Sequence, residues 1–250
     1  LVGDFDEAIE QKQFCMYLQP QMTSDGKMIG AEALVRWQHP KRGLIFPGDF
    51  IENFERTGLI YRLDRFIWEL AVQQLAKWQK EGRDELYISV NISTKDFQYM
   101  DVYQTITSLV ERYGIIPSTL KLEITETAIM MGNAGELETI GRFRNYGFEV
   151  EIDDFGSGYS SLNTLKDIDV DVLKIDMGFL RTTRSERVER SMSILNMIIS
   201  LSKILGLSVV TEGVETKDQV SRLSQMGCGV YQGYYFSKPI PVHEFEERYM

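Results

Sequence analysis

The segment Leu120–Asp154, LKLEITETAIMMGNAGELETIGRFRNYGFEVEIDD, is the part of the sequence that decides the fold. Short apolar runs at Leu120–Ile124 and Glu149–Ile152 predict two buried strands. Between them, Ala134–Tyr146 has the spacing of apolar residues that is typical of a helix with one buried face. A strand, a helix and a second strand in this order favour parallel pairing of the strands, with the helix outside the sheet.

The same alternation runs along most of the chain. Asp25-Gly26 lies between the first two strand-like runs and signals a hairpin, so we expect these two strands to be antiparallel. Eight strands in 250 residues predict an α/β fold, a TIM-type barrel with an irregular start, formed by one domain over residues 1–250. The other predicted strands are Met16–Gln21, Ile29–Trp37, Leu86–Ile92, Val170–Ile175, Leu207–Thr211 and Gly229–Tyr231, and the other predicted helices are Leu63–Gln79, Val102–Tyr113, Ser185–Leu205, Lys217–Gln225 and Val242–Tyr249.

The composition limits the partners. Lys and Arg number 27 and Asp and Glu number 37, so the net charge of −10 argues against binding to nucleic-acid polymers. A small phosphorylated ligand stays possible, because a metal ion can reverse the local sign of the charge. Cys15 and Cys228 are too few for a disulfide framework and predict buried free thiols in the reducing cytoplasm. The apolar stretch Ser193–Val210 is interrupted by Asn196 and Lys203, and we interpret it as a helix followed by a strand, not as a bilayer crossing.

Polar and charged residues end or follow most of the predicted strands, and Glu32 lies within the second. In a (β/α)8 barrel the carboxyl ends of the strands meet at one face, where active sites lie. One acid at a strand end would simply pair with a loop Lys or Arg, but several acids at one face repel one another and need cations or protons. In chain order these residues are Glu32, Asn91, Glu123, Asp153, Lys174, Glu212 and Gln232, separated by 59, 32, 30, 21, 38 and 20 residues.

The donor atoms of this set favour hard metal ions. They are oxygens, and the two histidines, His39 and His243, lie in loop-like contexts away from the strand ends. Mg²⁺ or Mn²⁺ is therefore favoured over Zn²⁺. The adjacent acids Asp153 and Asp154 suggest two ions that share one bridging carboxylate. Two ions about 4 Å apart are a known device for phosphodiester cleavage.

Seven short motifs in order along the chain carry a family resemblance. Together they resemble the motif series of the EAL domain family, which are bacterial cyclic di-GMP phosphodiesterases. The resemblance runs from about Phe5 to Phe245. The motifs are Glu32–Trp37 (EALVRW), Asn91–Ser93 (NIS), Glu123–Glu126 (EITE), Asp153–Leu162 (DDFGSGYSSL), Lys174–Asp176 (KID), Glu212–Glu215 (EGVE) and Gln232–Tyr234 (QGY).

The resemblance implies a modified TIM (β/α)8 barrel with one antiparallel strand and hydrolysis of cyclic di-GMP to linear pGpG with two Mg²⁺ or Mn²⁺ ions. Carried over position by position, the ligands of these ions are Glu32, Asn91, Glu123, Asp153, Asp154 and Glu212.

The resemblance also assigns roles to other residues. Lys174 would contact the attacking water, and its role as a base or as an electrostatic partner stays open. Glu215 and Gln232 would support the site, and Gln19 would touch the ligand from the first strand. Arg36 would hold a ligand phosphate, which fits the bidentate geometry of a guanidinium group.

The loop Asp153–Leu162 would link the metal site to a homodimer interface, with Glu126 as its anchor. We further expect this chain to be a piece of a longer protein, because it begins at Leu1 and not at Met. We expect no membrane contact from this segment and a cytoplasmic location, which leaves open a membrane anchor elsewhere in the full-length protein.

Two other functions compete with an active phosphodiesterase. A catalytically silent cyclic di-GMP receptor would be favoured by the loss of a metal ligand, whereas every ligand position of the motif series is filled here. A metal-dependent lyase of the enolase type, with a Lys base, needs a separate capping domain for which 250 residues leave no room.

Overall fold

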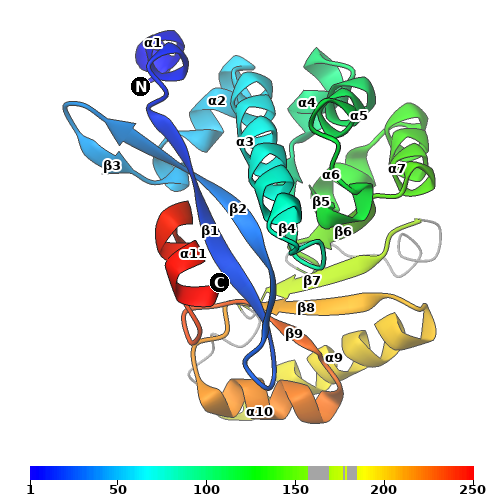
Figure 1. Ribbon diagram of the computed structural model, residues 1–250. Coiled ribbons are helices and arrows are strands. Elements are labelled where there is room, and N and C mark those ends of the chain that lie inside the picture. The colour runs from blue at the N-terminus through cyan, green and yellow to red at the C-terminus, as the bar shows by residue number, and fades with distance from the viewer. Residues whose placement is uncertain (157–168, 177, 179–184) are drawn as a thin grey trace. The chain divides into compact units, whose positions relative to one another are not determined.

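The computed structural model describes residues 1–156, 169–176, 178 and 185–250 (Figure 1). The chain divides into two compact units. The first unit comprises Leu1–Gln19, Ala31–Lys121 and Pro239–Met250, and the second comprises Pro20–Gly30 and Leu122–Lys238.

The eight predicted strands are all present. They are β1 (Phe14–Thr23), β2 (Met28–His39), β4 (Tyr87–Ile92), β5 (Leu120–Thr125), β6 (Glu149–Asp153), β7 (Val172–Asp176), β8 (Ser208–Glu212) and β9 (Val230–Tyr231). Two short strands, β3 (Gly43–Ile45) and β10 (Ile240–Pro241), were not predicted. The hydrogen-bonded order is β10-β1-β9-β8-β7-β6-β5-β4-β2-β3, and β1 additionally pairs with β2.

Strand β1 runs antiparallel to β9 and β10. β1 pairs antiparallel with β9, whereas β6, β7, β8 and β9 pair parallel in sequence. The turn between β1 and β2 carries Gly26 at a φ of +84°, and Thr23 donates its N–H to the Lys27 carbonyl at 2.9 Å. Glycine adopts this left-handed backbone without the steric cost that other residues meet, which is why Asp25-Gly26 was a usable hairpin signal. The predicted antiparallel strand is confirmed.

The helices include every one predicted from the apolar spacing. In the first unit they are α1 (Phe5–Glu10), α2 (Ile51–Thr57), α3 (Ile60–Lys80), α4 (Thr94–Tyr99), α5 (Val102–Tyr113) and α11 (Val242–Tyr249). In the second unit they are α6 (Glu126–Met131), α7 (Ala134–Tyr146), α9 (Ser185–Ile204) and α10 (Lys217–Met226).

The apolar stretch Ser193–Val210 divides between the end of α9 and the start of β8, as predicted. Among the helices that the structure describes, none combines the length and the apolar character that a bilayer crossing needs.

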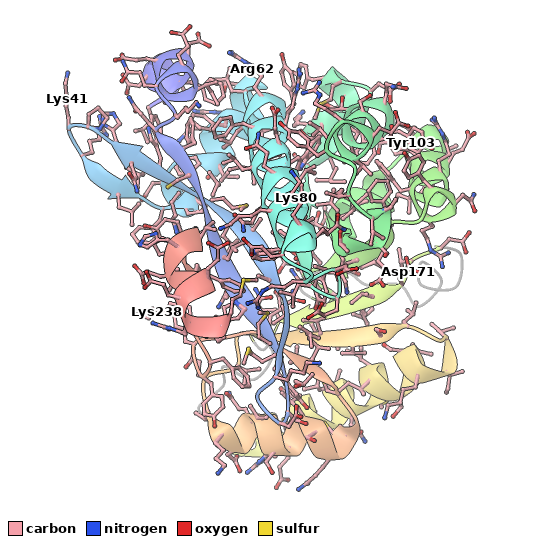
Figure 2. The ribbon with its side chains drawn as sticks, in the orientation of Figure 1. Lys41, Arg62, Lys80, Tyr103, Asp171 and Lys238 are labelled. Atoms are coloured by element: carbon pink, nitrogen blue, oxygen red, sulfur yellow. The ribbon has the colours of Figure 1, made fainter. Side chains whose placement is uncertain are left out.

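A partly exposed ion pair in the second unit fixes the start of β7. Asp171, labelled in Figure 2, accepts a hydrogen bond from Arg144 Nη2 of α7 at 2.8 Å. The same carboxylate accepts the Val150 N–H of β6 at 3.0 Å. These bonds join α7, β6 and β7 immediately before the strand that carries Lys174. The position of Lys174 along its neighbours is therefore set by local contacts.

Candidate active site

The strand register in the second unit places the predicted site residues on one face. Asp176 lies opposite Glu212 and Lys174 lies opposite Val210 across the β7–β8 pair, while Glu151 lies opposite Val172 across β6–β7. Successive side chains on a strand point to opposite faces, so residues two apart share a face. Asp153, Lys174 and Glu212 therefore point to the same side of the sheet.

Lys174 is fully buried and lies among three carboxylates. Its Nζ donates to Glu123 Oε2 at 2.6 Å, and it lies 2.7 Å from Glu212 Oε1 and 3.3 Å from Asp153 Oδ1. Glu123 is also fully buried, whereas the side chains of Asp153 and Glu212 are 14% and 17% exposed. Three carboxylates and one ammonium group leave two negative charges in a site with little solvent to screen them.

The donor chemistry of this cluster fits a hard divalent cation. Its oxygens are carboxylates, which Mg²⁺ and Mn²⁺ prefer, and the uncompensated charge of −2 matches one such ion. Among the described residues, no three His, Cys, Asp or Glu side chains are arranged closely enough to hold a metal ion as they stand. The ammonium group of Lys174 lies between the carboxylates. These residues fit a metal by charge and donor type.

The turn after β6 brings a second acid to the same strand end. Asp154 is exposed and has a φ of +55°, a left-handed conformation that Asp tolerates better than most residues. The next residue, Phe155, donates its N–H to the Lys174 carbonyl at 3.1 Å, which ties the turn to β7. Gly156 donates to Glu126 Oε2 at 3.0 Å, so Glu126 contacts the start of this loop, as the family resemblance implies. Residues 157–162 of the predicted interface loop lie outside the described residues.

A close backbone approach fixes the position of Gln232. Its carbonyl accepts the Val214 N–H at 3.1 Å. A Cβ atom on the next residue, Gly233, would lie only 2.2 Å from the Val214 carbonyl oxygen, so the two segments can approach this closely only at a glycine. The Gln232 side chain is buried and accepts a hydrogen bond from Gln21 Nε2 at 2.9 Å. Glu215, which follows Val214, is exposed, and its N–H donates to Gln219 Oε1 at 2.8 Å, just before α10.

In the first unit, Glu32 and Asn91 lie side by side. Asn91 Nδ2 donates to Glu32 Oε1 at 3.3 Å, and Glu32 is buried. Trp68 Nε1 of α3 donates to the Asn91 carbonyl at 2.9 Å, which holds the end of β4 against the helix. The carboxylate of Glu32, within β2, and the amide oxygen of Asn91, near the end of β4, are both ligands of the kind that hard cations take.

Arg36 lies between two aromatic rings. Its guanidinium group is 5.5 Å from the centre of the Tyr17 ring and 5.3 Å from that of Phe46, and Nη1 donates to the Val35 carbonyl. These contacts restrict the side chain, so less entropy remains to be lost when it binds an anion. Gln19, two residues from Tyr17 on β1, is buried and shares its face.

Several contacts could not be found from sequence spacing. Gln21 and Trp68 hold site residues in place and were not singled out. Gln21 lies two residues after Gln19 on β1 and so shares its face. The loop context predicted for the two histidines is wrong. His39 ends β2 with its Nε2 3.6 Å from Asp4 Oδ2, and His243 lies in the first turn of α11.

The cysteine prediction holds in part. Both cysteines are free thiols, but only Cys228 is fully buried, since Cys15 is partly exposed.

Comparison with known proteins shows the family. Residues 2–239 match the EAL domain, and the chain belongs to the EAL domain family. It is 35% identical over 245 residues to the bifunctional diguanylate cyclase/cyclic di-GMP phosphodiesterase MucR of Pseudomonas aeruginosa. It is also 35% identical, over 243 residues, to the cyclic di-GMP phosphodiesterase PdeR of Escherichia coli. These matches cover 98% and 97% of this chain but only 36% of each relative, so the chain spans about a third of their length.

Solved structures give the same fold. The phosphodiesterase domain of MucR in complex with c-di-GMP superposes with a TM-score of 0.91, at 35% identity and with 98% of both chains covered. An EAL domain protein from Listeria monocytogenes EGD-e superposes with a TM-score of 0.82 at 30% identity, over all of this chain and 97% of that one. The predicted α/β fold of the TIM-barrel type is confirmed.

Proposed function

We propose that this chain is a phosphodiesterase domain that hydrolyses cyclic di-GMP to linear pGpG with two Mg²⁺ or Mn²⁺ ions. The observation that carries the proposal is the buried cluster in which Lys174 meets Glu123, Asp153 and Glu212 with a net charge of −2. Family membership supports the substrate, since relatives at 35% identity are named cyclic di-GMP phosphodiesterases.

Six of the site residues are proposed to hold the metal ions. Glu32, Asn91, Glu123, Asp153, Asp154 and Glu212 would hold the ions. When bound, such a pair of ions activates a water and stabilises the leaving oxygen.

Lys174 contacts the attacking water and offsets charge that develops during the reaction. Glu215 and Gln232 support the site around Lys174. Arg36 binds a phosphate of the ligand from a position already restricted by Tyr17 and Phe46, and Gln19 contacts the ligand from β1. Such binding acts on the ground state and the transition state alike.

Product analysis tests the proposal directly. The purified domain is mixed with cyclic di-GMP and Mg²⁺ or Mn²⁺, and the nucleotides are separated by ion-exchange chromatography. We expect linear pGpG, no turnover after exhaustive chelation, and inhibition by Ca²⁺, whose longer and looser coordination misplaces the reactants. Binding of cyclic di-GMP without turnover would instead establish the silent receptor, and turnover in the absence of any divalent ion would refute the metal site.

We also propose that the domain forms a homodimer in the cytoplasm. A stripe of exposed apolar residues on α9 supports self-association: Ile194 is 42% exposed, Met197 71% and Ile204 81%. Their spacing places them on one side of the helix, whereas Leu195 and Ile199 on the other side are buried. Light scattering at assay concentration tests this, with Met197→Lys expected to shift the mass towards the monomer and a monomeric, fully active wild type counting against it.

A further inference from the structure

Two acidic side chains outside the predicted site residues lie together in the first unit. Asp64 is on α3, and Asp96 is in the first turn of α4. Asp96 is fully buried, and its Oδ2 accepts the backbone N–H of Ser93 at 2.7 Å. This bond and the Ser93 side chain, which accepts the backbone N–H of Asp96, form the capping box that begins α4, and Ser93 Oγ also accepts the Lys95 N–H. The carboxyl group of Asp64 lies within hydrogen-bonding reach of Asp96.

The environment of this pair favours one shared proton. In the described part of the chain no N–H or O–H group donates to the buried Asp96 Oδ1. Asp96 is fully buried and Asp64 is partly buried. Two such carboxyl groups side by side cannot both ionise cheaply, and a proton between them replaces repulsion with a hydrogen bond. Burial and the charge of Asp96 hold the pKa of Asp64 well above its usual range, and burial raises the pKa of Asp96 to about 7.

Neighbouring charges do not neutralise the pair. The carboxylate of Glu55 on α2 adds negative charge that acts on both acids. On α4 itself, the ammonium group of Lys95 is bonded to Gln98 at 3.1 Å. A proton is therefore the positive charge that the structure offers to this pair at neutral pH.

The pair is connected to the end of β4 through α3. Asp64 and Trp68 are four residues apart and so lie on the same side of the helix. Trp68 bonds the Asn91 carbonyl at 2.9 Å, and Asp64 faces Asp96, which is bonded to Ser93. Helix α3 thus contacts both ends of the segment from Asn91 to Asp96, through Trp68 at Asn91 and through Asp64 at Asp96.

We propose that Asp64 and Asp96 are positioning residues that, through one shared proton, hold the Asn91–Ser93 segment against α3 and keep the Asn91 amide facing Glu32. The role of Asn91 in the reaction rests on the proposed function. When rising pH removes the shared proton, two carboxylates face each other and the end of β4 is no longer held. The domain therefore has a built-in alkaline limit, located at the α3–α4 contact.

Stability as a function of pH tests the shared proton without any ligand. The unfolded chain releases these protons near pH 4 and the folded chain keeps them to higher pH, so this contribution to stability falls as the pH rises through neutrality. We expect the urea midpoint of the wild type to fall between pH 5 and pH 8. Asp64→Asn, whose amide donates at every pH, loses most of that fall. The control Glu52→Gln removes an exposed carboxylate of α2 and keeps the wild-type profile. Parallel profiles for Asp64→Asn and the wild type overturn the proposal.

Kinetics test the positioning role. We expect the kcat/KM of the wild type for cyclic di-GMP to fall as the pH rises above about 7, and that of Asp64→Asn to persist to higher pH. An unchanged alkaline limb in Asp64→Asn overturns the positioning role. If cyclic di-GMP is not turned over at all, the proposed function fails, while the stability profiles still judge the pair.

A measurement on the wild type remains decisive if Asp64→Asn does not fold. Carbon-13 NMR of the aspartate carboxyl groups should show one resonance that titrates near pH 7. Titration of every aspartate below pH 5 would exclude the shared proton.

Discussion

Removing the charge of Lys174 should destabilise the domain as well as stop its chemistry. Lys174→Met keeps most of the apolar stem of the side chain and removes the ammonium group that Glu123, Asp153 and Glu212 surround. The charge of the cluster then changes from −2 to −3 without a matching cavity. Breaking a buried ion pair by removal of one partner costs about 3–5 kcal/mol.

The expected effect is large enough to measure by urea denaturation. With an m-value of about 3 kcal/mol per molar urea, a loss of about 3–5 kcal/mol lowers the midpoint by roughly 1–1.7 M. Added Mg²⁺ should reduce this loss, because a divalent ion supplies the positive charge that the variant lacks. The kcat should fall by about a hundredfold or more with a smaller change in KM, since contact with the attacking water matters as charge develops.

Lys80→Met serves as the matched control, because Lys80 is exposed on α3 (Figure 2). It should leave both the midpoint and the kcat within error of the wild type. If Lys174→Met is as stable as the wild type in the absence of divalent ions, the three carboxylates do not carry the charge assigned to them. If the variant keeps its kcat and only KM rises, Lys174 is a binding residue.

Three further substitutions examine other parts of the site. Glu32→Ala should cut kcat/KM by at least about a hundredfold, which corresponds to about 2.7 kcal/mol of transition-state stabilisation. It should also weaken Mn²⁺ binding measured by calorimetry while leaving the fold intact, and near-normal turnover would remove Glu32 from the ligand set. Arg36→Ala should chiefly raise KM in steady-state kinetics, because its phosphate contact acts on ground and transition states alike, and a drop in kcat alone would contradict this role. Gly233→Ala should lower the urea midpoint, because its Cβ would lie 2.2 Å from the Val214 carbonyl oxygen and overpacking costs about 1–3 kcal/mol; an unchanged midpoint would mean that the two segments separate freely.

The regular elements were predictable because their periodicity repeats several times. Each predicted strand is found within two residues of its expected bounds, and α5, α7 and α11 match theirs. β3 and β10 contain three and two residues, too few for alternation to be visible. The short helices α1, α2, α4 and α6 extend for six or seven residues, less than the length over which an apolar stripe can be recognised. α4 did carry a usable signal, since Ser93 and Asp96 have the spacing of a capping box.

Strand-end acids were predictable for a topological reason, and their partners were not. Asp153 and Glu212 each end a strand, and Glu123 lies two residues before the end of β5. Parallel strands bring such ends to one edge whatever the loops do. The bond from Trp68 to the Asn91 carbonyl and the pairing of Asp64 with Asp96 depend instead on how α3 is rotated against β4 and α4. That rotation is set by packing between elements, which a single sequence does not display.

The register of β7 links the stability of the fold to the site. Val172, Lys174 and Asp176 share a face, while Leu173 and Ile175 on the other face are buried and apolar. A shift of this strand by one residue would turn Lys174 away from the three carboxylates and expose two apolar side chains to them. Such a shift would leave Glu123, Asp153 and Glu212 with no ammonium group between them, and it would also break the Asp171 contacts to Arg144 and Val150. The charges of the site thus disfavour the alternative pairing of the strand that carries them.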